Sequence, residues 1–240
     1  MLTVAGLTWF VRTQRPVRDN GGHEAEPMRI AVFGAGGRVG SRTVAEALER
    51  GHEVTGVVRD PEAHDLHGDG LIVVAGDATD PASVAEVAAG HDLAISTVGT
   101  GFGKTPETLP AAARALLEGL SRAGVARLIV LGGAGSLEVA PGVRVLDTEG
   151  FREEWKPDAL AQAESLDIYR SATTDVDWTY VSPAALLEPG ERTGAYRTGD
   201  DRLLVDEEGN SAISMEDFAV ALLDEAESAD HVRRRFTVAS

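Results

Sequence analysis

RIAVFGAGGRVG, residues 29 to 40, is the stretch of this sequence that decides the fold. Its first five residues, Arg29 to Phe33, are typical of a buried strand, and Val39 to Arg50 carries the apolar spacing of a helix. A glycine-rich turn joins the two. A helix N-terminus placed in this way presents free backbone N–H groups and a partial positive charge to an anion. The stretch therefore predicts a phosphate-binding turn at the edge of an α/β sheet.

Each of three glycines in this turn has a different expected role. Gly34 can make the tight turn, Gly37 lets the backbone approach a diphosphate, and Gly40 lets the helix pack closely on the strand. The spacing is G-x-x-G-x-x-G, because the last glycine of G-x-G-x-x-G, counted from Gly34, would fall at Val39. A second strand that ends about 18 residues after Gly40 favours a dinucleotide as the ligand. The alternative is a helix cap without a ligand.

Outward from this turn, short apolar runs alternate with helical patterns, which is typical of βαβ units. This pattern predicts a Rossmann α/β fold, a doubly wound parallel sheet with helices on both faces and a small C-terminal extension on the substrate side. The expected strands are Arg29 to Phe33, Glu53 to Val58, Leu71 to Ala75, Leu93 to Thr97, Arg127 to Leu131 and Trp178 to Val181. The expected helices are Val39 to Arg50, Pro81 to Ala89, Leu109 to Ala123 and Asp158 to Ser171.

The alternation stops after Pro183. A polar, Gly-rich stretch to Asn210 predicts a short hairpin, Ser214 is the expected N-cap of a last helix, and Arg235 to Val238 is a candidate final strand. Residues 1–27 differ from the rest and are expected to form a disordered leader, with residues 28–240 as one domain. Arginines follow the apolar stretch of this leader, an order that a secretory signal reverses.

Composition narrows the classes of partner. The formal net charge of −17 opposes approach to nucleic acids and anionic membranes, whose partners carry Lys and Arg clusters. The chain has no cysteine, which excludes disulfides, thiolate metal sites and thiol redox chemistry. The six histidines form no metal-ligand pattern, and His64-x-x-His67 is expected at the surface, so no metal is predicted. A cytoplasmic enzyme or sensor is the expectation that follows.

The end of the second strand distinguishes NAD from NADP. A carboxylate there would bond the ribose 2′-hydroxyl and repel a 2′-phosphate, whereas this chain has Val58-Arg59-Asp60. Arg59 can pair with the phosphate, and Arg38 can help. Asp60 argues little against this, because Asp-Pro also suits the N-cap of a following helix. We therefore expect NADP(H) rather than NAD(H).

Two further strand ends belong to the same predicted edge. Gly76-Asp77-Ala78 follows the third strand, where Asp77 can accept a hydrogen bond from an adenine amino group or serve as a turn residue. The small residues of Thr97-Val98-Gly99-Thr100 follow the fourth strand and allow a dinucleotide to lie against the backbone.

Taken together, these residues resemble the atypical short-chain dehydrogenase/reductases, specifically the NAD(P)H-binding, NmrA-like group that includes flavin reductase/biliverdin reductase B. The resemblance covers about Met28 to the C-terminus and also rests on Gly132-Gly133-Ala134-Gly135-Ser136, Trp178 to Pro183, and Thr193-Gly194-Ala195-Tyr196. It implies a nicotinamide near Gly132 to Gly135 and Pro183. The candidate cofactor contacts are Gly34, Gly36, Gly37, Arg38, Val39, Gly40, Arg59, Asp77, Ala78, Gly99, Thr100, Gly132, Gly133 and Pro183.

One departure from the family pattern concerns catalysis. Most short-chain dehydrogenases use Tyr-x-x-x-Lys as a proton donor, but residues four before the two lysines are Thr100 and Arg152, so the motif is absent. Matching the helices puts approximately Ala163 and Asp167 at those positions. Loss of a general acid costs about 10²–10⁴ in rate for reactions that need a proton in the transition state.

Hydride transfer to a flavin, a quinone or another conjugated small-molecule acceptor suits such a site, because the acceptor spreads the developing charge. Ser136 is the one candidate catalytic hydroxyl after the fifth strand, and a plain loop serine is the alternative. Trp155, Phe151 and Tyr196 can form an aromatic wall or a core or lid. Missing catalytic residues equally fit a non-catalytic NADP sensor that acts through a protein partner, and fit an epimerase or dehydratase less well.

Overall fold

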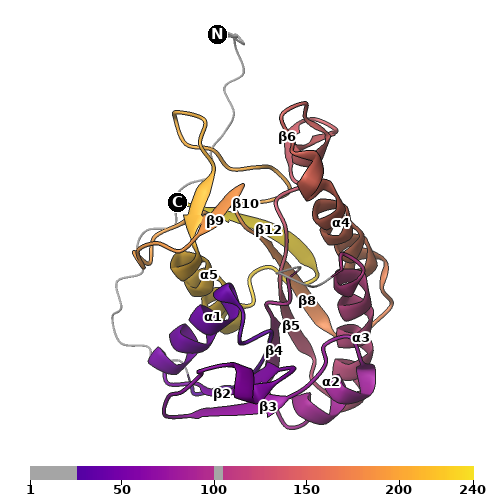
Figure 1. Ribbon diagram of the computed structural model, residues 1–240, viewed down its shortest axis with the longest axis vertical. Coiled ribbons are helices and arrows are strands. Elements are labelled where there is room, and N and C mark those ends of the chain that lie inside the picture. The colour runs from indigo at the N-terminus through magenta and orange to yellow at the C-terminus, as the bar shows by residue number, and fades with distance from the viewer. Residues whose placement is uncertain (1–25, 100–104) are drawn as a thin grey trace.

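The computed structural model describes residues 26–99 and 105–240. Within them an eight-stranded sheet forms the centre of the molecule, with strand order β10-β12-β8-β5-β4-β1-β2-β3 (Figure 1). Seven strands run parallel, and β10 pairs antiparallel with β12. The strands are β1 (Arg29–Phe33), β2 (Glu53–Val58), β3 (Leu71–Ala75), β4 (Leu93–Ser96), β5 (Arg127–Leu131), β8 (Asp177–Ser182), β10 (Arg197–Gly199) and β12 (Arg234–Ala239).

Helices cover both faces of this sheet, as Figure 1 shows. α1 (Arg38–Glu49) and α5 (Met215–Ser228) pack together on one face; α2 (Pro81–Ala88), α3 (Thr108–Ala123) and α4 (Lys156–Ser171) lie on the other. β1 shows why both faces need cover. Ile30 and Val32 belong to the apolar core beneath α1 and α5, whereas Ala31 and Phe33 belong to the opposite core. A strand buried on both sides is apolar at successive positions, as parallel sheets require.

The Rossmann-like architecture is thus confirmed, and every expected strand and helix is present with ends that shift by at most two residues. The residues expected to begin and end the helices also do so in the structure. Asp80 caps α2, Ser214 accepts a hydrogen bond from the Asp217 amide at the start of α5, and Gly124 ends α3 in the left-handed conformation at φ +73°. Among the described helices, none combines the length and apolar character that crossing a lipid bilayer demands.

The C-terminal extension corrects one expectation. The hairpin expected between Pro183 and Asn210 does not form: β9 (Leu186–Glu188) pairs in parallel with β11 (Ala212–Ser214), while β10 joins the main sheet. These short strands pair with later parts of the chain, so no tight turn connects them to each other. A hairpin forms instead after β5, from β6 (Glu138–Ala140) and β7 (Val143–Arg144).

The segment with β6 and β7 and the extension after β8 are linked above the carboxyl ends of β5 and β8. The Glu138 amide donates to the Asp201 carbonyl at 2.9 Å, and the Leu203 amide donates to the Glu138 carbonyl at 3.0 Å. In an open parallel sheet the ligand site lies at this carboxyl edge. The fold thus encloses that edge with both segments.

Candidate functional site

The glycine turn has the local geometry predicted for Gly34 and Gly40. Gly34 has φ +83°, a conformation that favours glycine, and its amide donates to the Val57 carbonyl at 3.1 Å. A Cβ on Gly40 would lie 2.1 Å from the Gly34 carbonyl oxygen, so α1 approaches β1 at a distance that only glycine allows. Gly37 is exposed, and a Cβ on it would meet only that same oxygen, at 3.2 Å.

The first turn of α1 offers its amides to a ligand. Gly37 is the N-cap, and because glycine has no side chain it cannot cap the helix with a side-chain hydrogen bond. The first turn contains no acidic residue. The N–H groups of Arg38, Val39 and Gly40 have no partner within the helix, because the first amides of any α-helix lack one. The Val39 side chain is buried in the core, so only its backbone can face a ligand. This end of α1 suits an anion such as a diphosphate.

Two exposed arginines flank the amide cradle, which consists of the N–H groups of Arg38, Val39 and Gly40. Arg38 and Arg59 form no ion pair with any described residue, whereas most of the other described arginines do. Asp60 pairs with neither of these arginines. Its carboxylate accepts from the Glu62 amide at 3.1 Å and caps a short 3₁₀ segment, Pro61–Ala63. The N-cap interpretation of Asp60 is therefore confirmed, and both guanidinium groups can take an anion.

Sequence reasoning missed where His64 lies. The side chain is exposed, as expected, but its ring packs on the glycine turn, since a Cβ on Gly36 would lie 2.4 Å from the His64 Cε1 and Nδ1 atoms. Gly36 therefore gives room to an imidazole, a role that the glycine spacing alone does not indicate.

The ends of β3 and β4 lie at the same carboxyl edge. One carboxylate oxygen of Asp77 accepts from the Thr79 amide at 2.8 Å and from the Thr79 hydroxyl at 2.6 Å, so Asp77 shapes its own turn. Ala78 packs against the core under α2 and α3. A Cβ on Gly99 would meet no atom of the described residues within 4 Å. Thr100 and Lys104 lie outside the described residues.

The two adjacent glycines after β5, Gly132 and Gly133, lie close to side chains of β8 and α4. A Cβ on Gly132 would lie 2.0 Å from the Tyr180 ring, and a Cβ on Gly133 would lie 3.0 Å from the Cβ and Cγ of Gln162. Ser182 donates to the Gly133 carbonyl at 3.0 Å, which ties this turn to the buried Pro183 that follows β8. Side chains from α4 and β8 therefore fill the space into which a side chain at position 132 or 133 would extend.

Ser136 is held by the C-terminal strand. The Arg235 guanidinium donates to the Ser136 hydroxyl oxygen at 2.8 Å and also pairs with Asp201. The hydroxyl oxygen thus already accepts one hydrogen bond. Trp155 is half-exposed with Phe151 against it at 6.2 Å between ring centroids, whereas the Tyr196 hydroxyl donates to Asp224 at 2.7 Å. Phe151 and Trp155 form a pair, and Tyr196 is held by α5.

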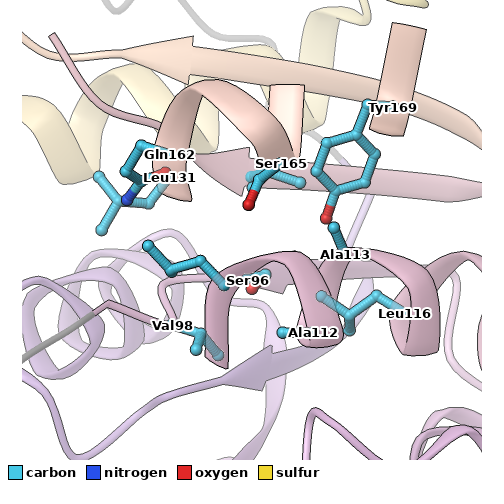
Figure 2. Close-up of a pocket in the computed structure, with 11 residues that line it drawn as sticks. Ser96, Val98, Ala112, Ala113, Leu116, Leu131, Gln162, Ser165 and Tyr169 are labelled. Atoms are coloured by element: carbon cyan, nitrogen blue, oxygen red, sulfur yellow. The ribbon is translucent and has the colours of Figure 1, made fainter. Parts of the chain in front are cut away.

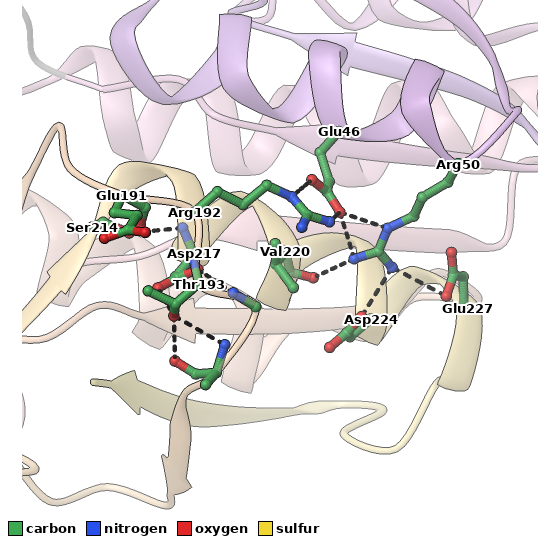
Figure 3. Close-up of polar contacts among 12 residues, drawn as sticks. Glu46, Arg50, Glu191, Arg192, Thr193, Ser214, Asp217, Val220, Asp224 and Glu227 are labelled. Carbon is green, nitrogen blue, oxygen red and sulfur yellow. Dashed lines mark hydrogen bonds and ion pairs between the residues drawn. The ribbon is translucent and has the colours of Figure 1, made fainter. Parts of the chain in front are cut away.

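Residues 190–196 follow the edge of α1 and α5 and are held by carboxylates of these two helices, of which Glu46 and Asp217 are buried (Figure 3). Arg192 forms a two-pronged pair with Glu46 of α1, at 2.7 and 2.9 Å. Asp217 of α5 accepts from the Thr193 and Gly194 amides, both at 2.8 Å. Burial alone would raise the pKa of Glu46, but hydrogen bonds from Arg192 and Arg50 outweigh it and hold that pKa below its usual value. Thr193 and Gly194 are thus fixed beside the N-terminal half of α5.

A small cavity of about 10 Å³ lies between α3 and α4 (Figure 2). Its lining runs from the ends of β4 and β5 to the middle of α4, with Gln162 beside Leu131 and across from Val98. Ala163 and Asp167 occupy α4 as matched, the first buried and the second exposed. Neither position carries the tyrosine or the lysine of the common motif.

A parallel sheet with a glycine turn, free amides and basic side chains at its carboxyl edge defines a dinucleotide-binding protein of the Rossmann class. A model of an NAD(P)H-binding family matches residues 34–228, and the chain belongs to this NAD(P)H-binding family.

Three solved structures, all with provisional names, are similar over 89% of the chain. An exported protein of Burkholderia pseudomallei is 46% identical, with a TM-score of 0.81 and 100% of its chain covered. An epimerase of Bacteroides thetaiotaomicron is 40% identical, with a TM-score of 0.81 and 97% covered. The NADH-flavin reductase SP1627 of Streptococcus pneumoniae TIGR4 is 35% identical, with a TM-score of 0.76 and 99% covered.

Proposed function

We propose that this protein is an NADPH-dependent reductase that transfers hydride to a conjugated small molecule such as a flavin or a quinone. The observation that carries the proposal is the pair of exposed arginines, Arg38 and Arg59, that have no ion-pair partner among the described residues and flank the amide cradle. The same proposal includes a cytoplasmic location and excludes nucleic acid and membrane as partners, which the net charge of −17 supports.

The residues fit a dinucleotide. Among the described residues, Gly37 leaves the approach to the amides of Arg38 and Val39 open, and no atom lies within 4 Å of a Cβ placed on Gly99 at the end of β4. The diphosphate would lie on these amides, and the guanidinium groups of Arg38 and Arg59 would hold a 2′-phosphate. In a chain with so large an excess of carboxylates, two exposed arginines that form no ion pair with a described residue are most simply explained by an anionic ligand.

The residues near the ends of β5 and β8, where the electron acceptor would bind, support a reaction that needs no proton from the protein. When bound, NADPH supplies a hydride and becomes NADP⁺, and the reduced acceptor takes its proton from solvent. Ala163 is buried and cannot donate a proton, Ser136 is bonded to Arg235, and Tyr180 is buried with its hydroxyl engaged. An epimerase that relies on a tyrosine and lysine pair fits this edge less well.

Arg59→Ala tests the cofactor preference. One charge-assisted hydrogen bond contributes about 1.5–3 kcal/mol, so NADPH affinity should fall roughly ten- to more than hundredfold, while NADH affinity stays the same. Titration calorimetry of both cofactors measures this. Arg122→Ala is the matched control, because Arg122 is an exposed arginine at the far end of α3, paired with Glu118. An equal loss for the two cofactors would contradict the preference for NADPH.

Steady-state NADPH oxidation with flavin and quinone panels separates the reductase from the second candidate, a non-catalytic NADP sensor. A Gly37→Trp variant, with its side chain in the diphosphate approach, gives the background rate. Turnover well above that background supports the reductase. Tight NADPH binding with no turnover on any acceptor would favour the sensor, whose partner would be a protein.

A further inference from the structure

Gln162 lies where the acceptor site is expected. It is in the first half of α4, its Cβ and Cγ cover Gly133, and its side chain is beside Leu131 at the end of β5 (Figure 2). The neighbouring position, Ala163, is the one matched to the tyrosine of the common short-chain dehydrogenases, and its methyl group is buried. Gln162 is therefore a polar side chain that α4 presents at this edge, whereas the Ser165 hydroxyl further along α4 donates to the Ala161 carbonyl.

Tyr180 fixes the orientation of the Gln162 carboxamide. The Tyr180 hydroxyl lies 2.8 Å from Gln162 Oε1 and 3.0 Å from the Gln162 main-chain oxygen, and both of these atoms accept its proton. Burial raises the pKa of Tyr180 far above its usual value, and a backbone hydrogen bond from Gly133 offsets only part of that rise. The hydroxyl stays protonated at physiological pH, so it can donate to the carboxamide oxygen, the nearer of its two acceptors.

This arrangement leaves the Gln162 amino group available. No acceptor among the described residues takes a hydrogen bond from Nε2, and the side chain is half-buried rather than sealed in the core. An amide N–H donates hydrogen bonds but transfers no proton near neutral pH. A donor of this kind can orient a carbonyl oxygen and stabilise the negative charge that develops on it.

We propose that Gln162 Nε2 is the hydrogen-bond donor that binds a carbonyl oxygen of the electron acceptor, with Tyr180 as a positioning residue behind it. The inference rests on the proposed reductase function and names its acceptor class more narrowly, as conjugated carbonyl compounds such as quinones and isoalloxazines. The chain holds such an acceptor by a neutral hydrogen bond at the place where related enzymes use a proton donor.

Equilibrium titrations with menadione and riboflavin, which carry no titrating phosphate, test this role with and without saturating NADP⁺. Gln162→Leu should weaken acceptor binding about tenfold, the equivalent of one hydrogen bond, and leave the NADP⁺ affinity unchanged. Tyr180→Phe should cause a smaller loss, because the carboxamide is then free to rotate. Glu164→Gln is the matched control on the exposed side of α4, and circular dichroism checks that each variant is folded.

Gln162→Glu separates a hydrogen-bonding role from a merely structural one. Its carboxylate cannot donate, so menadione binding should be weak at neutral pH and should recover as the pH falls and the carboxyl group gains its proton. A loss that does not change with pH would overturn the proposal. So would equal acceptor binding by the wild type and Gln162→Leu, or no acceptor binding by a wild type that binds NADPH. Failure of NADPH binding itself would instead remove the proposed function, and the cofactor titration detects it separately.

Discussion

Gly40 shows how one absent side chain sets the distance between α1 and β1. A methyl group there would lie 2.1 Å from the Gly34 carbonyl oxygen and 2.7 Å from the Thr97 hydroxyl, so α1 would have to move outward. Gly40→Ala should destabilise the protein by about 1–3 kcal/mol through overpacking and should weaken NADPH binding, because the cradle amides move with the helix. Urea unfolding and calorimetry measure the two effects.

Gly150→Ala is the control for that change, because a Cβ at Gly150 meets no atom within 4 Å and its backbone does not need glycine. Its unfolding free energy should stay within about 0.5 kcal/mol of the wild type. A Gly40→Ala variant as stable as this control would show that α1 can move away from the sheet without loss of stability.

Residue roles at this scale were predictable only where sequence neighbours determine them. The roles of Gly34 and Gly40 follow from a strand, a turn and a helix in direct succession, and the structure has them as predicted. The contacts of Gly36 with His64 and of Gly132 with Tyr180 join residues far apart in the sequence. No spacing within a motif encodes such contacts, although a Gly-Gly pair after a strand is a signal that a bulky side chain comes close.

Between elements, Glu46 links α1 to α5 and to residues 190–196. Its side chain is only 4% exposed and its carboxylate accepts from Arg50 and Arg192, while Arg50 also pairs with Asp224 and Glu227 (Figure 3). Breaking a buried pair costs about 3–5 kcal/mol, and Glu46→Gln should be near the lower end, because Arg50 keeps two carboxylates. Chemical unfolding near neutral pH measures this loss, with Glu164→Gln as an exposed control.

The same variant should be less different from the wild type in acid. The pKa of Glu46 is lowered in the folded protein, so its stabilising contribution is present above the usual pKa of glutamate and is lost as the pH falls through the lowered value. The difference in unfolding free energy between wild type and Glu46→Gln should therefore shrink between about pH 7 and about pH 3. A constant difference would mean that ionisation of Glu46 contributes nothing.

Long elements were predictable and short ones were not. The strands and helices of the βαβ units carry apolar periodicity and local end signals, which is why their ends fall within two residues of the expected ones. β6, β7, β9 and β11 have two or three residues each and no periodicity. Their pairing depends on partners elsewhere in the chain, so the expected hairpin after Pro183 was wrong although the presence of an extension was right.

Across the whole molecule, burial predicts where the backbone opens first. β1 and β4 lie in the middle of the sheet with nearly every side chain buried, whereas β9 and the β6–β7 hairpin have mostly exposed side chains. Amide hydrogen exchange should therefore be slowest in β1 and β4 and much faster in the short strands. Mass spectrometry of exchanged peptides measures this order. Equal protection of β9 and β1 would contradict it.

The position of β12 between β8 and β10 has a consequence for synthesis on the ribosome. β10 emerges from the exit tunnel well before β12, but β12 is its partner in the sheet. Until Arg234–Ala239 is translated, the nascent chain leaves the edge of β8 uncovered and β10 unpaired. Unpaired edges attract other chains, so a ribosome stalled in this interval would hold a chain at risk of aggregation.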